Sequence, residues 1–275
     1  VACDALAGWL AEETAKPSPS VELRWDTVEL IGVDRNDHAT ERLTNWFDSS
    51  GFAVDRSEGV PSCCIELPRT WEDYIGWRSK SGRREIRQSV NHIDSGRLKV
   101  KSVKDPETFD LMWPKFVALH QSRRHATGTT GCFDYPGFES FLKNAGFDYL
   151  ASNQLELRFA MLRGNPIATL FAISDSDCFY LYQSGMNLIE PQLRPGLSLL
   201  SHAIRESIEL GRHRFDMMRG DESYKLRLRA ERQATVDTRI FSSKSTARLR
   251  GKLYRAGVTM KNLFRTGIGD SSPAG

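Results

Sequence analysis

The sequence lacks the features that mark membrane-spanning, secreted or metal-binding proteins. It contains no apolar run near the roughly 18 residues that a membrane span needs, and no signal peptide is visible at its start. It begins at Val1, which leaves open that an upstream part is missing. Neither an HExxH motif nor a cluster of His and Cys is present, so we expect no metal site. The five cysteines show no CxxC spacing, which predicts reduced thiols and a cytoplasmic protein.

The composition is that of a soluble globular protein, with 40% hydrophobic and 27% charged residues. The 275 residues suffice for one large or two modest domains. A net charge of +3 does not by itself indicate nucleic-acid binding, but the charge is unevenly distributed. Seven Lys or Arg residues and no acidic residue occur between Lys244 and Gly269. The sequence therefore predicts a basic C-terminal tail, residues 243–275.

One stretch, residues 178–225, organises the rest of the prediction. It opens with an aromatic-rich strand, residues 179–183, which Ser184-Gly185 closes. Pro195-Gly196 then opens a segment whose apolar residues recur at helical spacing. Residues 213–217 form a second short strand, so the stretch predicts a βαβ unit. The first turn of such a helix offers free backbone N–H groups to an anion.

The remaining elements divide the chain into three further regions. Residues 1–68 indicate an incomplete α/β domain, with helices at 3–16 and 38–50 and strands at 21–33, 52–56 and 62–67. Residues 69–97 indicate a basic helical linker, whose Arg and Lys face is either solvated or binds an anion. Residues 98–242 indicate the main domain, with strands at 98–103, 155–163, 167–174 and 235–241 and helices at 106–123 and 137–150.

Four motifs carry a family resemblance: Leu119-His120 with Arg123, Tyr182 to Gly185, Pro195 to Leu200, and Phe215 to Lys225. They resemble the GNAT acyltransferase superfamily and, within it, the CelD-like group, which is named for cellulose biosynthesis. This group is similar to the FemABX transferases, which have two GNAT-like domains in tandem. At Leu193 and Ser198 the chain departs from the usual family pattern.

The resemblance implies an α/β (α+β) fold of the GNAT type. Its central sheet would be mixed, mainly antiparallel and flanked by helices, and a partial or degenerate GNAT-like N-terminal domain would precede it. The resemblance also implies acyl-CoA, such as acetyl-CoA, as the co-substrate, and no metal.

Acyl transfer from a thioester requires that the donor's phosphates are anchored and its carbonyl polarised. The N–H groups at the start of the helix after Arg194 suit a pyrophosphate, and backbone N–H groups at the end of the preceding strand suit the carbonyl oxygen. An ordinary helix cap is the alternative explanation of the Pro-Gly start. The predicted donor-binding residues are Gln183, Ser184, Gly185, Met186, Arg194, Gly196, Leu197 and Ser198.

The reaction also requires a proton acceptor for the attacking amine. His120 is the better candidate for a general base near neutral pH, because a carboxylate beside Lys and Arg keeps a lowered pKa and suits substrate positioning. The alternatives are that His120 only packs at its helix end and that residues 221–225 form a structural ion-pair turn. The predicted catalytic residues are His120, Asp221, Glu222, Tyr224 and Lys225. The predicted substrate-binding residues are Arg83, Arg84, Arg123 and Arg219.

These observations lead to three hypotheses about function. The first is a cytoplasmic N-acyltransferase that transfers an acyl group from acyl-CoA to an amine on a sugar or cell-surface polysaccharide precursor. Its basic tail would contact the inner membrane surface, pack on the protein as a helix or be disordered. The second is a FemABX-like transferase that takes an aminoacyl group from charged tRNA, and nucleic acid is expected as a partner in this case alone. The third is a catalytically degenerate scaffold or membrane-surface module.

Overall fold

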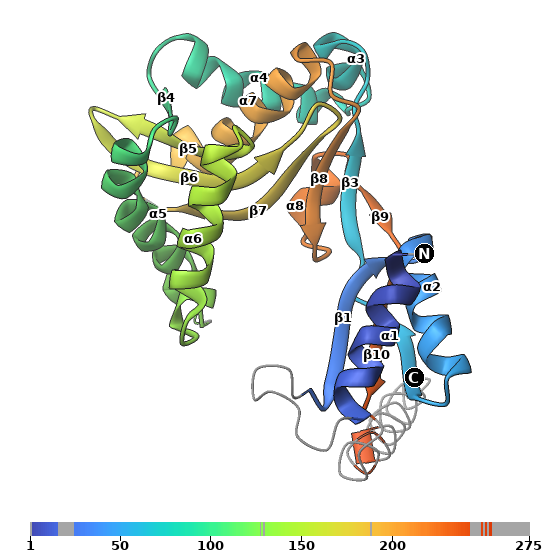
Figure 1. Ribbon diagram of the computed structural model, residues 1–275. Helices are drawn as coiled ribbons and strands as arrows, with labels where there is room; N and C mark the ends of the chain where they lie inside the picture. The colour runs from blue at the N-terminus through green and yellow to red at the C-terminus, as the bar shows by residue number, and fades with distance from the viewer. Residues whose placement is uncertain are drawn as a thin grey trace, which may run out of the picture. The chain divides into compact units, whose positions relative to one another are not determined.

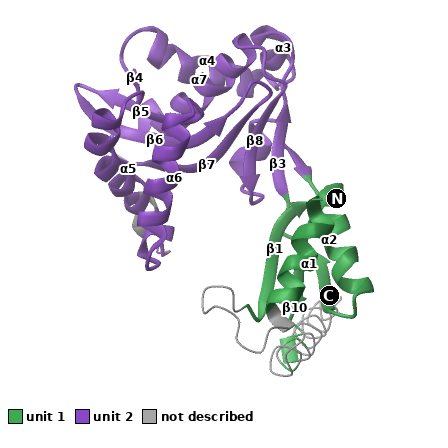
Figure 2. Cartoon of the chain, viewed as in Figure 1, with its two compact units in different colours: residues 1–61, 233–275 green, residues 62–232 purple. Residues whose placement is uncertain are grey.

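The protein is described by a computed structural model that covers residues 2–15, 25–126, 128, 130–187, 189–242, 249, 251 and 253–254. It forms two compact units, residues 1–61 with 233–275 and residues 62–232 (Figure 2). Within the described residues, no helix combines the length and apolar character that a membrane crossing requires. The predicted basic tail, residues 243–275, lies almost entirely outside the described residues.

The smaller unit is a three-stranded antiparallel sheet with two helices. Its elements are α1 (Ala2–Ala15), β1 (Thr27–Asp34), α2 (His38–Ser49), β2 (Ala53–Glu58) and β10 (Thr235–Phe241). The strand order is β1-β10-β2, and Ala7, Phe47 and Ile240 form the buried core. The sequence analysis assigned residues 235–241 to the main domain. In the structure this strand instead lies between β1 and β2 and pairs with both, so the two ends of the chain fold together.

The larger unit contains a seven-stranded sheet with helices on both faces (Figure 1). Its helices are α3 (Trp71–Gly76), α4 (Lys80–Asp94), α5 (Pro106–Ala126), α6 (Phe138–Ala151), α7 (Pro195–Glu209) and α8 (Ser223–Arg227), with the 3-10 helices η2 (Cys132–Asp134) and η3 (Pro191–Leu193). Its strands are β3 (Ser62–Glu66), β4 (Lys99–Ser102), β5 (Leu155–Leu162), β6 (Asn165–Ser174), β7 (Cys178–Met186), β8 (Arg214–Arg219) and β9 (Glu231–Gln233).

The order of the large sheet is β4-β5-β6-β7-β8-β3-β9. The pairs from β4 to β7 and the pair β3–β8 are antiparallel, whereas β7 and β8 are parallel and joined through α7. This arrangement confirms the predicted mixed, mainly antiparallel sheet flanked by helices, and it confirms the βαβ unit. Residues 62–66 were expected to belong to the N-terminal domain, but they pair with β8 in the large sheet.

The central strand β6 shows how the two faces of the sheet are covered. Successive side chains of a strand point to opposite faces. Leu170 and Ala172 lie in the core cluster that contains the apolar face of α7, whereas Phe171 lies in the cluster of α5 aromatic residues. Helix α4 packs on α7 from outside. Thr70 caps the start of α3, since its hydroxyl accepts a hydrogen bond from the Asp73 N–H at 3.1 Å.

The break between α3 and α4 falls at residues 77–79, because the Ser79 side chain caps α4 by accepting from the Gly82 N–H. Gly82 therefore lies inside the first turn of α4. This break places the first turn of α4 directly after Trp77 and Arg78, which matters for the surface described below.

The parallel strands β7 and β8 separate after a short contact. They pair from Cys178 with Arg214 to Tyr180 with Asp216, after which β7 continues to Met186. On its other edge, β7 carries a bulge against β6, because Leu181 pairs with Ala172 while Gln183 pairs with Phe171. Beyond the residues where β7 pairs with β8, every second residue of β7 directs its backbone N–H and C=O groups toward the gap between these two strands. The separation therefore leaves a wedge in the sheet beside the first turn of α7.

Candidate active site

A narrow pocket of about 330 Å³ lies along β7 and the start of α7. It is bounded by mostly apolar side chains, among them Ile86, Leu170, Leu199 and Leu228. Five of the predicted donor-binding residues line it: Ser184, Gly185, Met186, Gly196 and Leu197. The structure thus brings these residues together as the sequence analysis expected. Such a pocket fits a thin, largely apolar arm better than a charged group.

The first turn of α7 borders the narrow pocket with unpaired backbone donors. Arg194 precedes the helix in a left-handed conformation, with φ 44°, and Pro195 is the first helical residue. The N–H groups of Gly196 and Leu197 have no carbonyl to bond within the helix, because they belong to its first turn. A Cβ atom on Gly196 would lie 2.9 Å from the Met186 sulfur, so the absence of a side chain lets Met186 pack against the helix start. The backbone donors of this turn fit an anionic group.

Two predicted donor residues lie elsewhere. The Ser198 side chain is fully buried and donates to the Leu193 carbonyl at 2.9 Å, so it holds the helix start together and does not line the pocket. Arg194 points toward α4, where its guanidinium pairs with the Glu85 carboxylate at 2.5 Å. Both residues therefore stabilise the start of α7.

A second, polar pocket of about 260 Å³ lies between the diverging ends of β7 and β8. Leu181, Ser184 and Tyr224 line both this polar pocket and the narrow pocket, so the two cavities meet at the wedge. The other side chains that line the polar pocket include Arg124, Tyr182, Gln183, Arg219 and Glu222. Two ligands entering from opposite sides would thus meet beside Tyr224.

Lys225 acts as a clamp below the polar pocket. Its side chain is 3% exposed, and its ammonium donates to the carbonyls of Met218, Arg219 and Gly220 at 3.3, 2.9 and 3.2 Å. It also pairs with Glu222 at 3.0 Å. Because its donors are directed at these groups, Lys225 shapes the turn at residues 218–220 and is not free for proton transfer. This turn includes the strained position Met218, with φ 58°.

Among the residues that line the polar pocket, Glu222 is the one carboxylate, and Tyr182 is one of two phenols. Burial alone would raise the pKa of Glu222, but hydrogen bonding and the charge of Lys225 outweigh it and lower the pKa. Burial raises the pKa of Tyr182. At neutral pH the pocket therefore presents an ionised Glu222, which suits the positioning of a cationic amine, as the sequence analysis expected of such a carboxylate.

His120 lies behind the polar pocket and does not line it. Its side chain is 1% exposed, and its Nε2 lies 3.0 Å from the Gln183 Oε1 and 3.7 Å from the Cys132 sulfur. Helix α5 approaches β7 closely here, because a Cβ atom added to Gly185 would lie 2.4 Å from the backbone nitrogen of His120. His120 therefore reaches the pocket through Gln183, and it orients this amide.

The other predicted residues are spread over different surfaces. Arg219 lines the polar pocket, whereas Asp221 is exposed and lies 3.7 Å from the Arg232 guanidinium. The side chain of Arg123 lies outside the described part of the structure. Arg83 borders a groove on the outer face of α4, away from the polar pocket.

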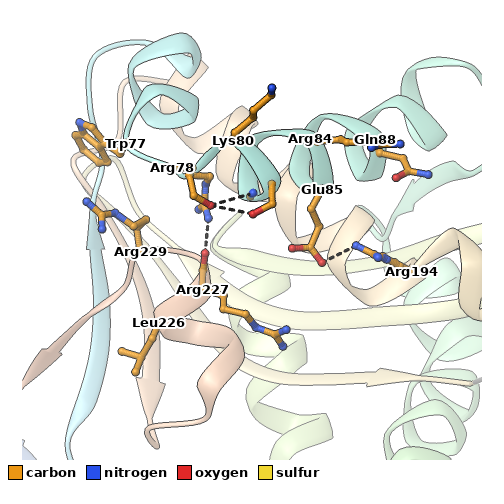
Figure 3. Close-up of a pocket in the computed structure, with 13 residues that line it drawn as sticks. Trp77, Arg78, Lys80, Arg84, Glu85, Gln88, Arg194, Leu226, Arg227 and Arg229 are labelled. Atoms are coloured by element: carbon orange, nitrogen blue, oxygen red, sulfur yellow. Dashed lines mark hydrogen bonds and ion pairs between the residues drawn. The ribbon is translucent and has the colours of Figure 1, made fainter.

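Arg84 lines a basic cleft of about 1250 Å³ (Figure 3). We use this name for the surface formed by residues 77–82, 84, 85, 88, 194, 226, 227 and 229. The sequence predicted only part of this surface, the basic face of residues 69–97, which was expected either to be solvated or to bind an anion. The cationic residues Arg78 and Lys80 had been noted only as part of a basic helix face. Arg227 and Arg229 were not assigned to a site, because they lie at the end of α8 and directly after it, and the sequence pattern did not reveal this five-residue helix.

The wedge, the helix start beside it and the two meeting pockets define the architecture of an acyltransferase of the GNAT type. The comparison with family models agrees: residues 80–226 match the model described as "Acetyltransferase (GNAT) domain". Since the match covers more than half of the 275 residues, the chain belongs to this family. Its general activity is accordingly acyl transfer.

Solved structures share the fold at low sequence identity. FemX is similar with a TM-score of 0.62 at 8% identity, over 90% of this chain and 79% of that one. A conserved protein of unknown function from Bacteroides thetaiotaomicron has a TM-score of 0.56 at 12% identity, covering 87% and 75%. L-PGS from Bacillus licheniformis has a TM-score of 0.52 at 12% identity, covering 82% and 72%. No match was found among curated proteins.

The residues of the site also indicate which kind of ligand it could bind. In the part of the chain that the structure describes, no three His, Cys, Asp or Glu side chains are grouped so that they could hold a metal ion. The groups that fit a ligand are instead backbone donors at Gly196 and Leu197, which suit a pyrophosphate, and the apolar narrow pocket, which suits a pantetheine arm.

Proposed function

We propose that the protein is an N-acyltransferase that transfers an acyl group from acyl-CoA, with acetyl-CoA as the simplest donor, to a primary amine. Within the family we assign it to the CelD-like group, on the motif from Phe215 to Lys225. The observation that carries the proposal is the junction of the narrow pocket and the polar pocket at Ser184 and Tyr224. One pocket takes the donor arm and the other takes the acceptor.

The residues at the junction suit direct transfer within a ternary complex. The donor supplies an activated thioester carbonyl. Backbone N–H groups at the end of β7 that face the wedge are placed to stabilise negative charge on its oxygen. A bond forms between the amine nitrogen and this carbon while the carbon–sulfur bond breaks. The amine proton passes to water while Glu222 positions the amine, and the Tyr224 hydroxyl is placed to protonate the departing thiolate.

The acceptor is proposed to be an amine on a sugar or a cell-surface polysaccharide precursor. The polar pocket supports a polar acceptor, since it offers an ionised carboxylate, Glu222, for an ammonium group and two guanidinium groups, Arg124 and Arg219, for oxygen-rich groups. Peripheral contact of the basic tail with a membrane surface stays a proposal from the sequence, because the tail lies outside the described residues.

The test combines donor binding with turnover. We expect calorimetry to detect acetyl-CoA binding, and release of the CoA thiol to depend on an amine acceptor drawn from a panel of amino sugars, polyamines and lysine derivatives. Tyr224→Phe should keep donor affinity within about twofold and lower kcat about tenfold or more, as expected for loss of a general acid. Absence of binding to any acyl-CoA would remove the proposed donor.

Charged tRNA is the competing donor. The fold shared with FemX and the cationic basic cleft give this second candidate its support. An interaction with tRNA phosphates should weaken steeply as salt rises, because cations and phosphates release counterions on binding. Transfer from aminoacyl-tRNA without any use of acyl-CoA would favour this candidate over the first.

A further inference from the structure

The basic cleft concentrates unpaired positive charge. Six cationic side chains line it against one carboxylate, and that carboxylate, Glu85, already pairs with Arg194. Within the described structure, Lys80, Arg84, Arg227 and Arg229 make no ion pair. Exposed cations that merely solubilise a surface are usually spread out or interspersed with acidic residues. Their convergence on one concave surface is an electrostatic arrangement that suits a multiply charged anion.

Arg78 is a buried cation at the base of the cleft. Its side chain is 7% exposed, its two terminal nitrogens donate to the Arg227 carbonyl and to the Tyr74 hydroxyl, and its Nε has no hydrogen-bond partner. Burial raises the pKa of Tyr74 to about 12, so this partner is a neutral phenol at physiological pH. A buried guanidinium that has only neutral partners is unfavourable unless an anion comes close.

The start of α4 adds backbone donors to the same surface. This helix has 15 residues, and its first turn, from Lys80, lines the cleft. Ser79 caps the Gly82 N–H at 3.2 Å, which leaves the N–H groups of Lys80 and Ser81 without intrahelical acceptors. The positive end of the helix dipole therefore points into a cleft that already carries an excess of cations.

The cleft is continuous with the narrow pocket. Glu85 and Arg227 line both cavities, and Arg194 lines the cleft while preceding the helix start that borders the narrow pocket. At the outer end, the Trp77 side chain is 43% exposed and offers an aromatic face. Figure 3 shows Trp77 and Arg229 on one side of the cleft and Arg84 and Arg194 on the other. The shape suits a ligand with an aromatic base and phosphates at one end and a thin arm at the other.

We propose that the basic cleft binds the phosphorylated adenosine end of the CoA donor, with the 3′-phosphate held by Lys80, Arg84 and Arg229 above the buried Arg78. The proposal rests on the acyl-CoA function and goes beyond it, because it assigns donor selection to α4 and the segment after α8. Through the 3′-phosphate, which is remote from the thioester, the protein thereby distinguishes CoA from dephospho-CoA.

Calorimetry with three ligands tests the proposal: CoA, dephospho-CoA and adenosine 3′,5′-bisphosphate. We expect CoA to bind about tenfold more tightly than dephospho-CoA, the contribution of about one charge-assisted contact. In the double variant Arg84→Ala, Arg229→Ala the preference should fall to about twofold or less. Arg87→Ala is the matched control, because Arg87 lies on the same helix, pairs with Glu72 and does not line the cleft, so the preference should stay.

Arg78→Met gives an independent readout through thermal stability. The unliganded variant should be as stable as the wild type or more so, because it removes a buried charge with neutral partners, and CoA should raise its Tm less than that of the wild type. If this variant fails to fold, the double variant alone decides the question.

The outcomes distinguish the assignment of the basic cleft from the acyl-CoA function on which it rests. Equal affinity for CoA and dephospho-CoA in the wild type would overturn the cleft assignment while leaving the acyl-CoA function intact. Absence of binding to every CoA form would remove both. Displacement of adenosine 3′,5′-bisphosphate by a short RNA oligonucleotide at lower concentration than by CoA would also overturn the assignment, in favour of a nucleic-acid surface.

Discussion

Lys225→Met tests whether the buried ammonium shapes the acceptor side of the site. The substitution keeps the length of the side chain and removes three hydrogen bonds to backbone carbonyls and one ion pair with Glu222. Hydrogen bonds to charged groups contribute about 1.5–3 kcal/mol each, but the variant also avoids burying a charge, and the freed carbonyls regain some water. We therefore expect a loss of about 2–4 kcal/mol in the free energy of unfolding.

Urea denaturation measures this loss, and Lys143→Met is the control. Lys143 pairs with Asp110 at 2.7 Å, but both side chains are partly exposed, so its removal should change stability by less than about 1 kcal/mol. In enzyme assays, Lys225→Met should raise the acceptor KM and leave the acetyl-CoA affinity unchanged, because the clamped turn lines the polar pocket only. An unfolding free energy equal to that of the control, or an equal loss of donor affinity, would refute the clamp.

Two further predictions concern the donor side and pH. Gly196→Ala should weaken acetyl-CoA binding by roughly threefold or more, because the new Cβ displaces the Met186 sulfur toward the narrow pocket. The Tm of this variant should stay the same or rise. The control Gly76→Ala adds a methyl group in open space and should change neither the affinity nor the Tm. Because the pKa of Glu222 lies below its usual value of 4.5, the carboxylate contributes stability above that pH and loses it as pH falls through the lowered pKa. Glu222→Gln should flatten this acid-side decline in urea titrations, and an unchanged decline would show that Glu222 does not contribute to it.

Local patterns in the sequence were sufficient to predict most of the helices and strands of the larger unit. The start of α7 at Pro195 depends on backbone chemistry that a single residue reports. The strands predicted at 155–163 and 167–174 meet at the turn between β5 and β6, where Arg163 and Gly164 both adopt positive φ as a tight hairpin requires. These features are local, so the sequence predicts them directly.

The partners of strands were not visible in the same way. Residues 62–66 and 235–241 have strand patterns, but nothing in the alternation of their side chains says which sheet they join. Pairing across more than 150 positions, as between Cys64 and Asp216, is decided by the whole fold. The predicted domain boundaries depended on sequence order and could not anticipate that β10 joins β1 and β2.

The candidate site shows the same limit at the level of side chains. Crowding of Asp221, Glu222, Tyr224 and Lys225 after a strand correctly drew attention to the turn, but it could not tell a clamp from a reactive group. Lys225 faces inward to backbone carbonyls, whereas Tyr224 lies at the junction of both pockets. The basic cleft was predicted only in part, because its cations come from segments far apart in the sequence, the start of α4 and the end of α8.

Under the proposed function, the donor and the acceptor are recognised by different parts of the site. The proposed donor side uses backbone N–H groups at the start of α7, which are retained whenever residue 196 has a small side chain. The proposed acceptor side uses side chains of the turn after β8, which Lys225 holds by hydrogen bonds to its carbonyls. Substitutions at Arg219 or Glu222 can therefore change the acceptor while the donor geometry stays fixed. We expect acceptor specificity to be altered by variants of this turn, with acetyl-CoA affinity as the unchanged reference.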